Sequence, residues 1–195
     1  MDMAADSEES IRGQYEALGV RDFYATRGGS YRNPHGEIVR QIVFAAVERF
    51  SLDLSAVLDL ACGSGEATIP LLELGAGQID AVDPYTGEAY RQRTGRTAAP
   101  LSFEDVAAGG LAGRRYSLIV CSFALHLASP SRLPALLCQL AQLTRQSGRL
   151  LVITPHKRPE IPEPWGWRLA EELLIERVRG RLYRSLIELS DPIDS

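Results

Sequence analysis

The stretch VLDLACGSGEATIPLL, residues 57–72, carries the strongest local signal in the chain. An apolar run breaks at Cys62-Gly63-Ser64-Gly65 and resumes with helical spacing, and an acid, Asp59, lies inside the run. Glycine lets the backbone approach a ligand closely, and a helix start directs free N–H groups at it. A strand, a glycine turn and a helix therefore predict a nucleotide-type site.

The ligand of this site is not expected to carry phosphates. Thr68 stands where a dinucleotide fingerprint has its third glycine, and the stretch lacks the lysine of a phosphate-binding loop. Glu66 at the helix start would repel a pyrophosphate. The stretch therefore favours a ligand with a positive centre. Asp59 suits such a ligand, either as an acceptor for an ammonium group or as an anchor of the glycine loop.

Strands and helices alternate after this stretch, with short connections. Strands are predicted at residues 56–61, 78–83, 100–105, 116–122 and 149–155, and helices at residues 66–76, 86–96 and 129–148. Such alternation indicates an α/β fold, a doubly wound and mostly parallel sheet with helices on both faces.

The two ends of the chain do not continue this alternation. Residues 1–50 are predicted to form an N-terminal helical extension or lid, in which a second helix begins near Asn33-Pro34. One apolar face of that helix is marked by Ile38, Ile42, Val43, Val47 and Phe50. Residues 51–195 are expected to form the core. Residues 165–189 allow either a helix or a strand, and we expect a short helix leading into a closing strand.

The composition is that of a globular protein of 195 residues, with 45% hydrophobic residues and a formal net charge of −4. This charge does not suggest general affinity for nucleic acid or for an anionic membrane. The three cysteines lack metal-ligand spacing, so no metal is expected and a reducing cytoplasm fits best. Neither a signal peptide nor a membrane span is expected.

The segment VLDLACGSG, residues 57–65, resembles motif I of the class I S-adenosylmethionine-dependent methyltransferases, which is usually written with a (D/E)xGxGxG core. Residues 56–155 line up with the later motifs of that family. One departure is Ala61, where many members have glycine; alanine is small enough that binding is expected to persist. The resemblance implies an enzyme that uses S-adenosyl-L-methionine. The cofactor is expected in the crevice between the ends of strands 56–61 and 116–122, which is the topological switch point of the sheet.

The resemblance also implies roles for individual residues. Asp59 and the backbone of residues 61–65 would hold the amino-acid end of the cofactor, and Asp83 would take both ribose hydroxyls. Pro84 and Tyr85 would flank the adenine. The full set of cofactor-binding residues implied in this way is Asp59, Ala61, Cys62, Gly63, Gly65, Asp83, Pro84, Asp105, Val106 and Ser122.

Several of these acids have structural alternatives. Asp59 can be a buried acid tied to backbone, and Asp83 can be a helix cap. Asp105 can accept the adenine amino group or cap a helix, and Glu104 competes with it for the first role.

Methyl transfer is an in-line displacement, so the protein mainly aligns the acceptor and excludes water. A hydroxyl acceptor needs a base, for which His126 is the first candidate and His35 the second. His126 can instead be a structural histidine whose hydrogen bonds are satisfied under the active-site loop. The residues expected to contact substrate are Tyr24, Tyr31, Arg32 and His126, although Tyr31 and Arg32 can simply anchor their loop.

The acceptor is expected to be a small organic molecule, methylated on oxygen or nitrogen. The segment SFALHL, residues 122–127, lacks the (N/D)PP(Y/F) motif typical of enzymes that methylate base amines, so nucleic acid is disfavoured. Two alternatives remain open. One is RNA or protein methylation through the arginine-rich end, and the other is a non-catalytic cofactor-binding or partner-binding protein of the same fold. A monomer or homodimer is expected.

Overall fold

The computed structural model describes residues 35–187. The elements, with η for a 3-10 turn, are α2 (Gly36–Phe50), β1 (Ala56–Leu60), α3 (Thr68–Glu73), β2 (Gln78–Val82), α4 (Gly87–Thr94), α5 (Phe103–Ala107), β3 (Tyr116–Ser122), η2 (Leu125–Leu127), α6 (Leu133–Gln142), β4 (Thr144–Thr154), η3 (Glu163–Trp165), β5 (Trp167–Ile175) and β6 (Val178–Ser185).

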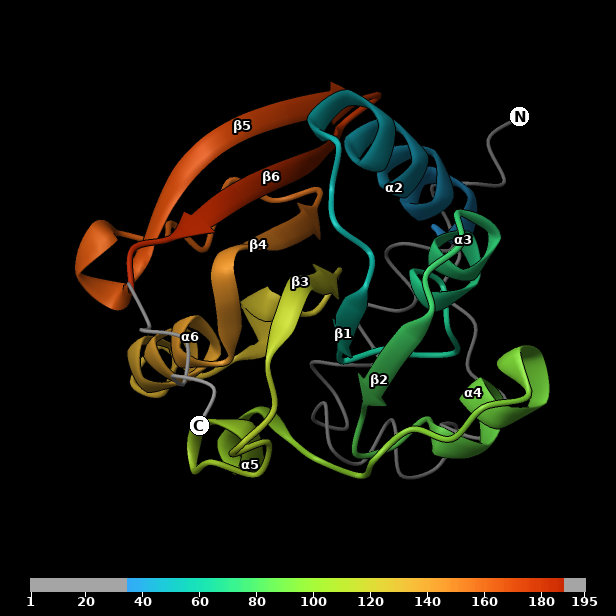
Figure 1. Cartoon of the computed structure of the whole chain (residues 1–195), viewed down its shortest axis with the longest axis horizontal. Coiled ribbons are helices and arrows are strands. Elements are labelled where there is room, and N and C mark those ends of the chain that lie inside the picture. The colour runs from blue at the N-terminus through green and yellow to red at the C-terminus, as the bar shows by residue number, and fades with distance from the viewer. Residues whose placement is uncertain (1–34, 188–195) are drawn as a thin grey trace, which may run out of the picture.

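One six-stranded sheet runs through the molecule in the order β2-β1-β3-β4-β6-β5 (Figure 1). The pairs β1–β2, β1–β3 and β3–β4 are parallel, and the pairs β4–β6 and β5–β6 are antiparallel. The chain leaves β1 toward β2 on one side and then crosses to β3 on the other. The predicted doubly wound, mostly parallel sheet is therefore confirmed, and its switch point lies between β1 and β3.

Helices cover both faces of the sheet, and each face has its own apolar cluster (Figure 1). On one face α2 and α3 pack against the strands. The predicted apolar stripe of α2 is confirmed, because Ile38, Ile42 and Val43 are buried there. On the other face α5 and α6 cover the sheet, and Trp167 is fully buried among them.

The predicted strand at residues 100–105 is wrong. Residues Phe103–Ala107 form the helix α5, because Ser102 and Asp105 build a capping box at its start. Only Ala99 keeps a strand-like pairing: its N–H donates to the Ala81 carbonyl at 2.8 Å, and its own carbonyl accepts from the Asp83 N–H at 3.0 Å.

The predicted helix at residues 129–148 is too long at its C-terminal end. The helix α6 ends at Gln142, and the Thr144 hydroxyl donates to the Ala141 carbonyl at 2.7 Å. Gly148 lies within β4, where a Cβ would stand 2.6 Å from the Cβ of Thr144. This glycine therefore serves a close approach between chain segments and does not end the helix.

The C-terminal segment is a hairpin. The closing strand was predicted correctly as β6, but the short helix expected before it is the strand β5. A register shift between Leu169 and Glu171 interrupts the alternation of β5, which hides its strand pattern in the sequence.

No helix among residues 35–187 is long and apolar enough to cross a membrane. The first predicted helix and the residues Asn33 and Pro34 lie outside the described residues. The boundary predicted at residue 50 stays a prediction; α2 shares its apolar cluster with the sheet.

Candidate active site

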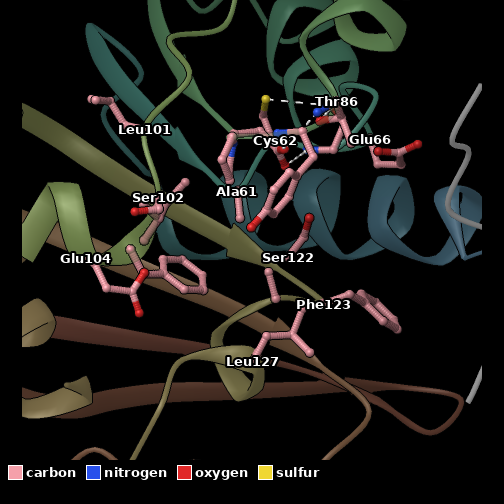
Figure 2. A pocket seen from close by; sticks show the side chains of 17 residues that line it. Ala61, Cys62, Glu66, Thr86, Leu101, Ser102, Glu104, Ser122, Phe123 and Leu127 are labelled. Atoms are coloured by element: carbon pink, nitrogen blue, oxygen red, sulfur yellow. Dashed lines mark hydrogen bonds between the residues drawn. The ribbon is translucent and has the colours of Figure 1, made fainter. Parts of the chain in front are cut away.

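A cavity of about 250 Å³ opens at the carboxyl ends of β1, β2 and β3 (Figure 2). This is the position at which open parallel sheets bind ligands, since the strands on either side of the switch point diverge there. The lining residues are Leu60, Ala61, Cys62, Gly63, Glu66, Asp83, Pro84, Tyr85, Thr86, Leu101, Ser102, Phe103, Glu104, Ser122, Phe123, Ala124 and Leu127.

The loop after β1 turns sharply along one side of this cavity. Ala61, Gly63 and Gly65 all have left-handed backbone, with φ of 56°, 56° and 93°. A Cβ at Gly65 would lie 2.6 Å from the Cγ2 of Thr94, so that position has no room for a side chain. The predicted glycine turn is therefore formed, but Ala61 adopts a conformation that favours glycine.

Asp83 joins the glycine loop to the start of α4. Its Oδ1 accepts hydrogen bonds from the Tyr85 and Thr86 N–H groups at 2.9 and 3.0 Å, and its Oδ2 accepts one from the Gly63 N–H at 3.2 Å. The Thr86 hydroxyl closes the arrangement by donating to the Gly63 carbonyl at 2.7 Å. Because each carboxylate oxygen can accept two hydrogen bonds, Oδ2 keeps one acceptor position.

Asp59 lies beneath the loop and does not line the cavity. It is fully buried, its Oδ2 accepts from the Thr68 hydroxyl at 2.6 Å, and the Tyr90 hydroxyl lies 3.1 Å from that of Thr68. Its Oδ1 has no hydrogen-bond partner among residues 35–187. Desolvation raises the pKa of Asp59 to about 7, and the nearby Glu66 and Asp83 add to the rise. This geometry favours a structural role, in which Asp59 joins β1 to the start of α3 on the far side of the glycine loop.

Glu66 lines the cavity as part of a charged cluster. Its carboxylate accepts hydrogen bonds from the Ser64 N–H at 3.0 Å and the Ser64 hydroxyl at 2.5 Å, and it forms an ion pair with Arg93 of α4 at 2.6 Å. The Glu66 side chain is only 4% exposed, so Arg93 compensates a nearly buried charge.

The loop before α5 places a different acid at the cavity from the one the family resemblance implied. Asp105 is bonded to the hydroxyl and N–H of Ser102, and the hydroxyl bond is the main cause of the lowered pKa of this carboxyl. Val106 is buried in the core. Glu104 lines the cavity instead, near Ser102 (Figure 2), and Phe103 between them lines it too. Among the alternatives for Asp105, the geometry favours the cap.

The candidate bases flank the cavity without lining it. His126, in η2, meets the ring of His156 edge-on, with ring centroids 4.7 Å apart. Desolvation first, and His156 second, lower the pKa of His126 to about 4, although the residue as a whole stays exposed. His35 stacks on Phe123 with centroids 4.9 Å apart, and Phe123 does line the cavity.

The cavity therefore brings together only part of the predicted set. Ala61, Cys62, Gly63, Asp83, Pro84 and Ser122 line it, whereas Asp59, Gly65, Asp105 and Val106 do not. The substrate candidates Tyr24, Tyr31 and Arg32 lie outside the described residues.

Sequence reasoning missed several lining residues. Thr86 carries a hydroxyl group at the start of a predicted helix, and residues of this type favour the N-cap position. This signal could have identified Thr86 as a residue near the site. Leu101, Phe103, Ala124 and Leu127 are ordinary apolar residues, and nothing in their local pattern separates a cavity wall from a core.

The residues present fit S-adenosylmethionine. Asp83 retains an acceptor position at the cavity, which suits a ribose hydroxyl. Three carboxylates, on Glu66, Asp83 and Glu104, line the cavity, and no described lysine, arginine or histidine does. Such a lining favours a ligand with positive charge and no phosphate.

Comparisons with known proteins agree with this geometry. A family described as a methyltransferase domain matches residues 57–148. An uncharacterised protein of Schizosaccharomyces pombe is 31% identical over 231 residues, an alignment that spans 90% of this chain and 92% of that protein.

Solved structures with the same fold include the N-methyltransferase NodS of Bradyrhizobium japonicum WM9 in complex with S-adenosylhomocysteine. It has a TM-score of 0.65 and 14% identity, over 88% of this chain and 98% of that one. The magnesium protoporphyrin IX methyltransferase of Synechocystis PCC 6803 with bound S-adenosylmethionine has a TM-score of 0.56 and 19% identity, over 95% of this chain and 99% of that one.

Proposed function

The chain belongs to the class I S-adenosylmethionine-dependent methyltransferases, and from that premise we propose that it methylates an oxygen or nitrogen atom of a small organic acceptor. S-adenosylmethionine is its methyl donor. The charge of the cavity lining is the observation that supports a small acceptor best. Asp83 and Glu104 would repel the phosphates of a nucleic acid, and no described lysine, arginine or histidine lines the cavity to offset them; the charge of the third acid, Glu66, is compensated by Arg93.

The apolar part of the cavity suits the body of such an acceptor. Ala124 and Leu127, which follow Ser122, line it, and Leu127 is 38% exposed. Pockets for small molecules combine apolar walls with a few polar groups that orient the ligand. We therefore expect an acceptor with an apolar or aromatic body.

The chain's own residues bind, orient and exclude water. When bound, S-adenosylmethionine supplies an electrophilic methyl group on a positively charged sulfur. Asp83 would accept from one ribose hydroxyl, so the expectation that it takes both is reduced to one by its bonds to the loop. The loop of residues 61–65 would hold the amino-acid end, and Glu104 would accept from the adenine amino group. Ser122 and the residues after it would form the wall at the transferred methyl group, where exclusion of water favours transfer to the acceptor.

A hydroxyl acceptor needs a base, and His126 remains the first candidate. Its pKa is lowered to about 4, so its imidazole is neutral at pH 7, but it is a weaker base than an ordinary histidine, and its candidacy rests on its position after β3. If His126 is that base, the acidic limb of the pH–rate profile lies near pH 4 and not near pH 6.5. An amine acceptor that is already deprotonated needs no base.

Methyl transfer tests the proposal directly. The protein is incubated with methyl-labelled S-adenosylmethionine and a panel of phenols, hydroxy acids and amines, with RNA and protein extracts as competing acceptors. We expect label in a small molecule, with stoichiometric S-adenosylhomocysteine. Label in RNA or protein alone would contradict the proposal, and cofactor binding with no transfer to any acceptor would support the non-catalytic alternative.

The arginine-rich C-terminal hairpin gives little support to an RNA acceptor. Arg168 pairs with Glu163 at 2.6 Å, and Arg179 and Arg181 both pair with Glu172. These pairs reduce the positive charge that is available to bind the phosphates of RNA. A cytoplasmic location and a monomeric or homodimeric state stay predictions.

A further inference from the structure

Phe123 follows directly after β3 with an unusual backbone conformation. Its φ is 53°, in the left-handed region that a residue with a large side chain rarely adopts. Such a conformation persists only where the surrounding structure holds it in place, and it is found most often at functional sites.

Among the described residues, Phe123 packs against the apolar cluster beneath α2 and makes two further contacts. Its N–H donates to the Ile153 carbonyl of β4 at 2.8 Å. Its ring stacks on the ring of His35, with centroids 4.9 Å apart and planes inclined by 11°. His35 precedes α2, so this stack connects the start of α2 with the end of β3.

The conformation of Phe123 sets one wall of the cavity. Ser122, Phe123 and Ala124 all line it. In Figure 2 the Phe123 ring is turned away from Glu104, which lies on the other side of the cavity. The stack with His35 therefore acts on the wall mainly through the backbone of residues 122–124.

We propose that His35 is a positioning residue, which holds the cavity wall by stacking on Phe123 and needs a flat ring but no proton to do so. This role takes the place of the base considered for His35. The inference rests on the proposed function, because its test uses S-adenosylhomocysteine as the probe.

Two substitutions separate stacking from protonation and from stability. His35→Phe keeps a flat ring and loses the titratable group. His35→Ser loses the ring but introduces a preferred residue at the N-cap of α2, where the His35 side chain makes no capping hydrogen bond. By calorimetry, His35→Phe should bind S-adenosylhomocysteine within about twofold of wild type, and His35→Ser about two- to tenfold more weakly. Thermal unfolding of both variants checks that they are folded, so that a loss of affinity is not a loss of structure.

A double-mutant cycle with Phe123→Ala tests whether His35 acts through Phe123. Phe123→Ala should weaken binding in the wild-type background and have less effect in the His35→Ser background. Wild-type affinity in His35→Ser would overturn the inference, as would an equal loss in His35→Phe and His35→Ser. Additive effects in the cycle would overturn it too. Failure of the wild type to bind S-adenosylhomocysteine would refute the proposed function itself, which distinguishes the two failures.

Discussion

Ala61 occupies the position at which many members of the family have glycine. Its φ of 56° places a side chain in the left-handed region, at the first turn of the loop that lines the cavity. From the sequence, alanine was expected to be tolerated there because of its small size. The structure adds that backbone conformation, and not only size, makes this position unfavourable for alanine.

The substitution Ala61→Gly tests that view. Left-handed alanine costs roughly 1–2 kcal/mol, and the extra freedom of glycine in the unfolded chain offsets about 0.5–1 kcal/mol of the relief. We expect the free energy of unfolding in urea to rise by up to about 1 kcal/mol. The buried Ala81 of β2 is the control, since Ala81→Gly should lose about 1 kcal/mol. Equal losses in both variants would contradict the argument.

Asp59 leads to a prediction about pH. Its pKa is raised from the ordinary value near 3.8 to about 7, so between these values the folded protein holds a proton that the unfolded chain has released. Stability from this group therefore falls as the pH rises from about 4 to about 7, by at most roughly 1.4 kcal/mol per pH unit. Asp59→Asn keeps the acceptor for Thr68 and cannot titrate.

Urea unfolding of both proteins at several pH values measures this effect. The stability of wild type minus that of Asp59→Asn should fall between pH 5 and pH 7 and level off near pH 8. A difference that grows with pH would mean that Asp59 has a lowered pKa, as a stably ionised carboxylate does.

At the scale of elements, α4 is attached to the glycine loop through charge. Arg93 of α4 pairs with the nearly buried Glu66, whereas Arg91 of the same helix pairs with the exposed Glu88. We expect Arg93→Ala to lower the free energy of unfolding by about 2 kcal/mol, because Glu66 then lacks its arginine in a poorly hydrated place. Arg91→Ala should change it by less than about 0.5 kcal/mol. Similar effects of the two substitutions in urea unfolding would show that α4 is not held this way.

The helix α2 packs closely on the C-terminal hairpin. A Cβ at Gly180 of β6 would stand 2.7 Å from the Cγ2 of Ile42 and 3.2 Å from the side chain of Leu173. Gly180→Ala should therefore cost about 1–3 kcal/mol of stability, since α2 must move away from the sheet. Gly77 is the control, because a Cβ added there would have no atom within 4 Å. A Gly180→Ala variant as stable as Gly77→Ala in thermal unfolding would show that this packing is loose.

The sequence predicted elements well where a strong pattern is local. The strand β1, the glycine turn and the stripe of α2 each follow from periodicity and a few residue types. Errors arose where another interaction overrides the pattern. The capping box of Ser102 and Asp105 makes a helix of an expected strand, and a register shift hides the strand β5.

At the scale of the whole molecule, the switch point between β1 and β3 places the cavity. The sequence predicted this position, and Ala61, Gly63, Asp83 and Ser122 do meet there. It could not rank Glu104 above Asp105, because the side-chain directions around α5 depend on the cap. The contact between His35 and Phe123 was also out of reach, since residues 88 positions apart meet only through the tertiary fold.

Titration of S-adenosylmethionine into the wild type, Asp83→Asn and Asp83→Ala by calorimetry measures whether the cavity binds the methyl donor through Asp83. We expect one site in the wild type and a loss of roughly ten- to hundredfold in Asp83→Ala, since the one hydrogen bond that Asp83 can still accept, made to a charged group, contributes roughly 1.5–3 kcal/mol. Asp83→Asn, which keeps one acceptor oxygen, should fall between the two. Absence of binding in the wild type, or wild-type affinity in a folded Asp83→Ala, would show that the cavity does not hold S-adenosylmethionine through Asp83.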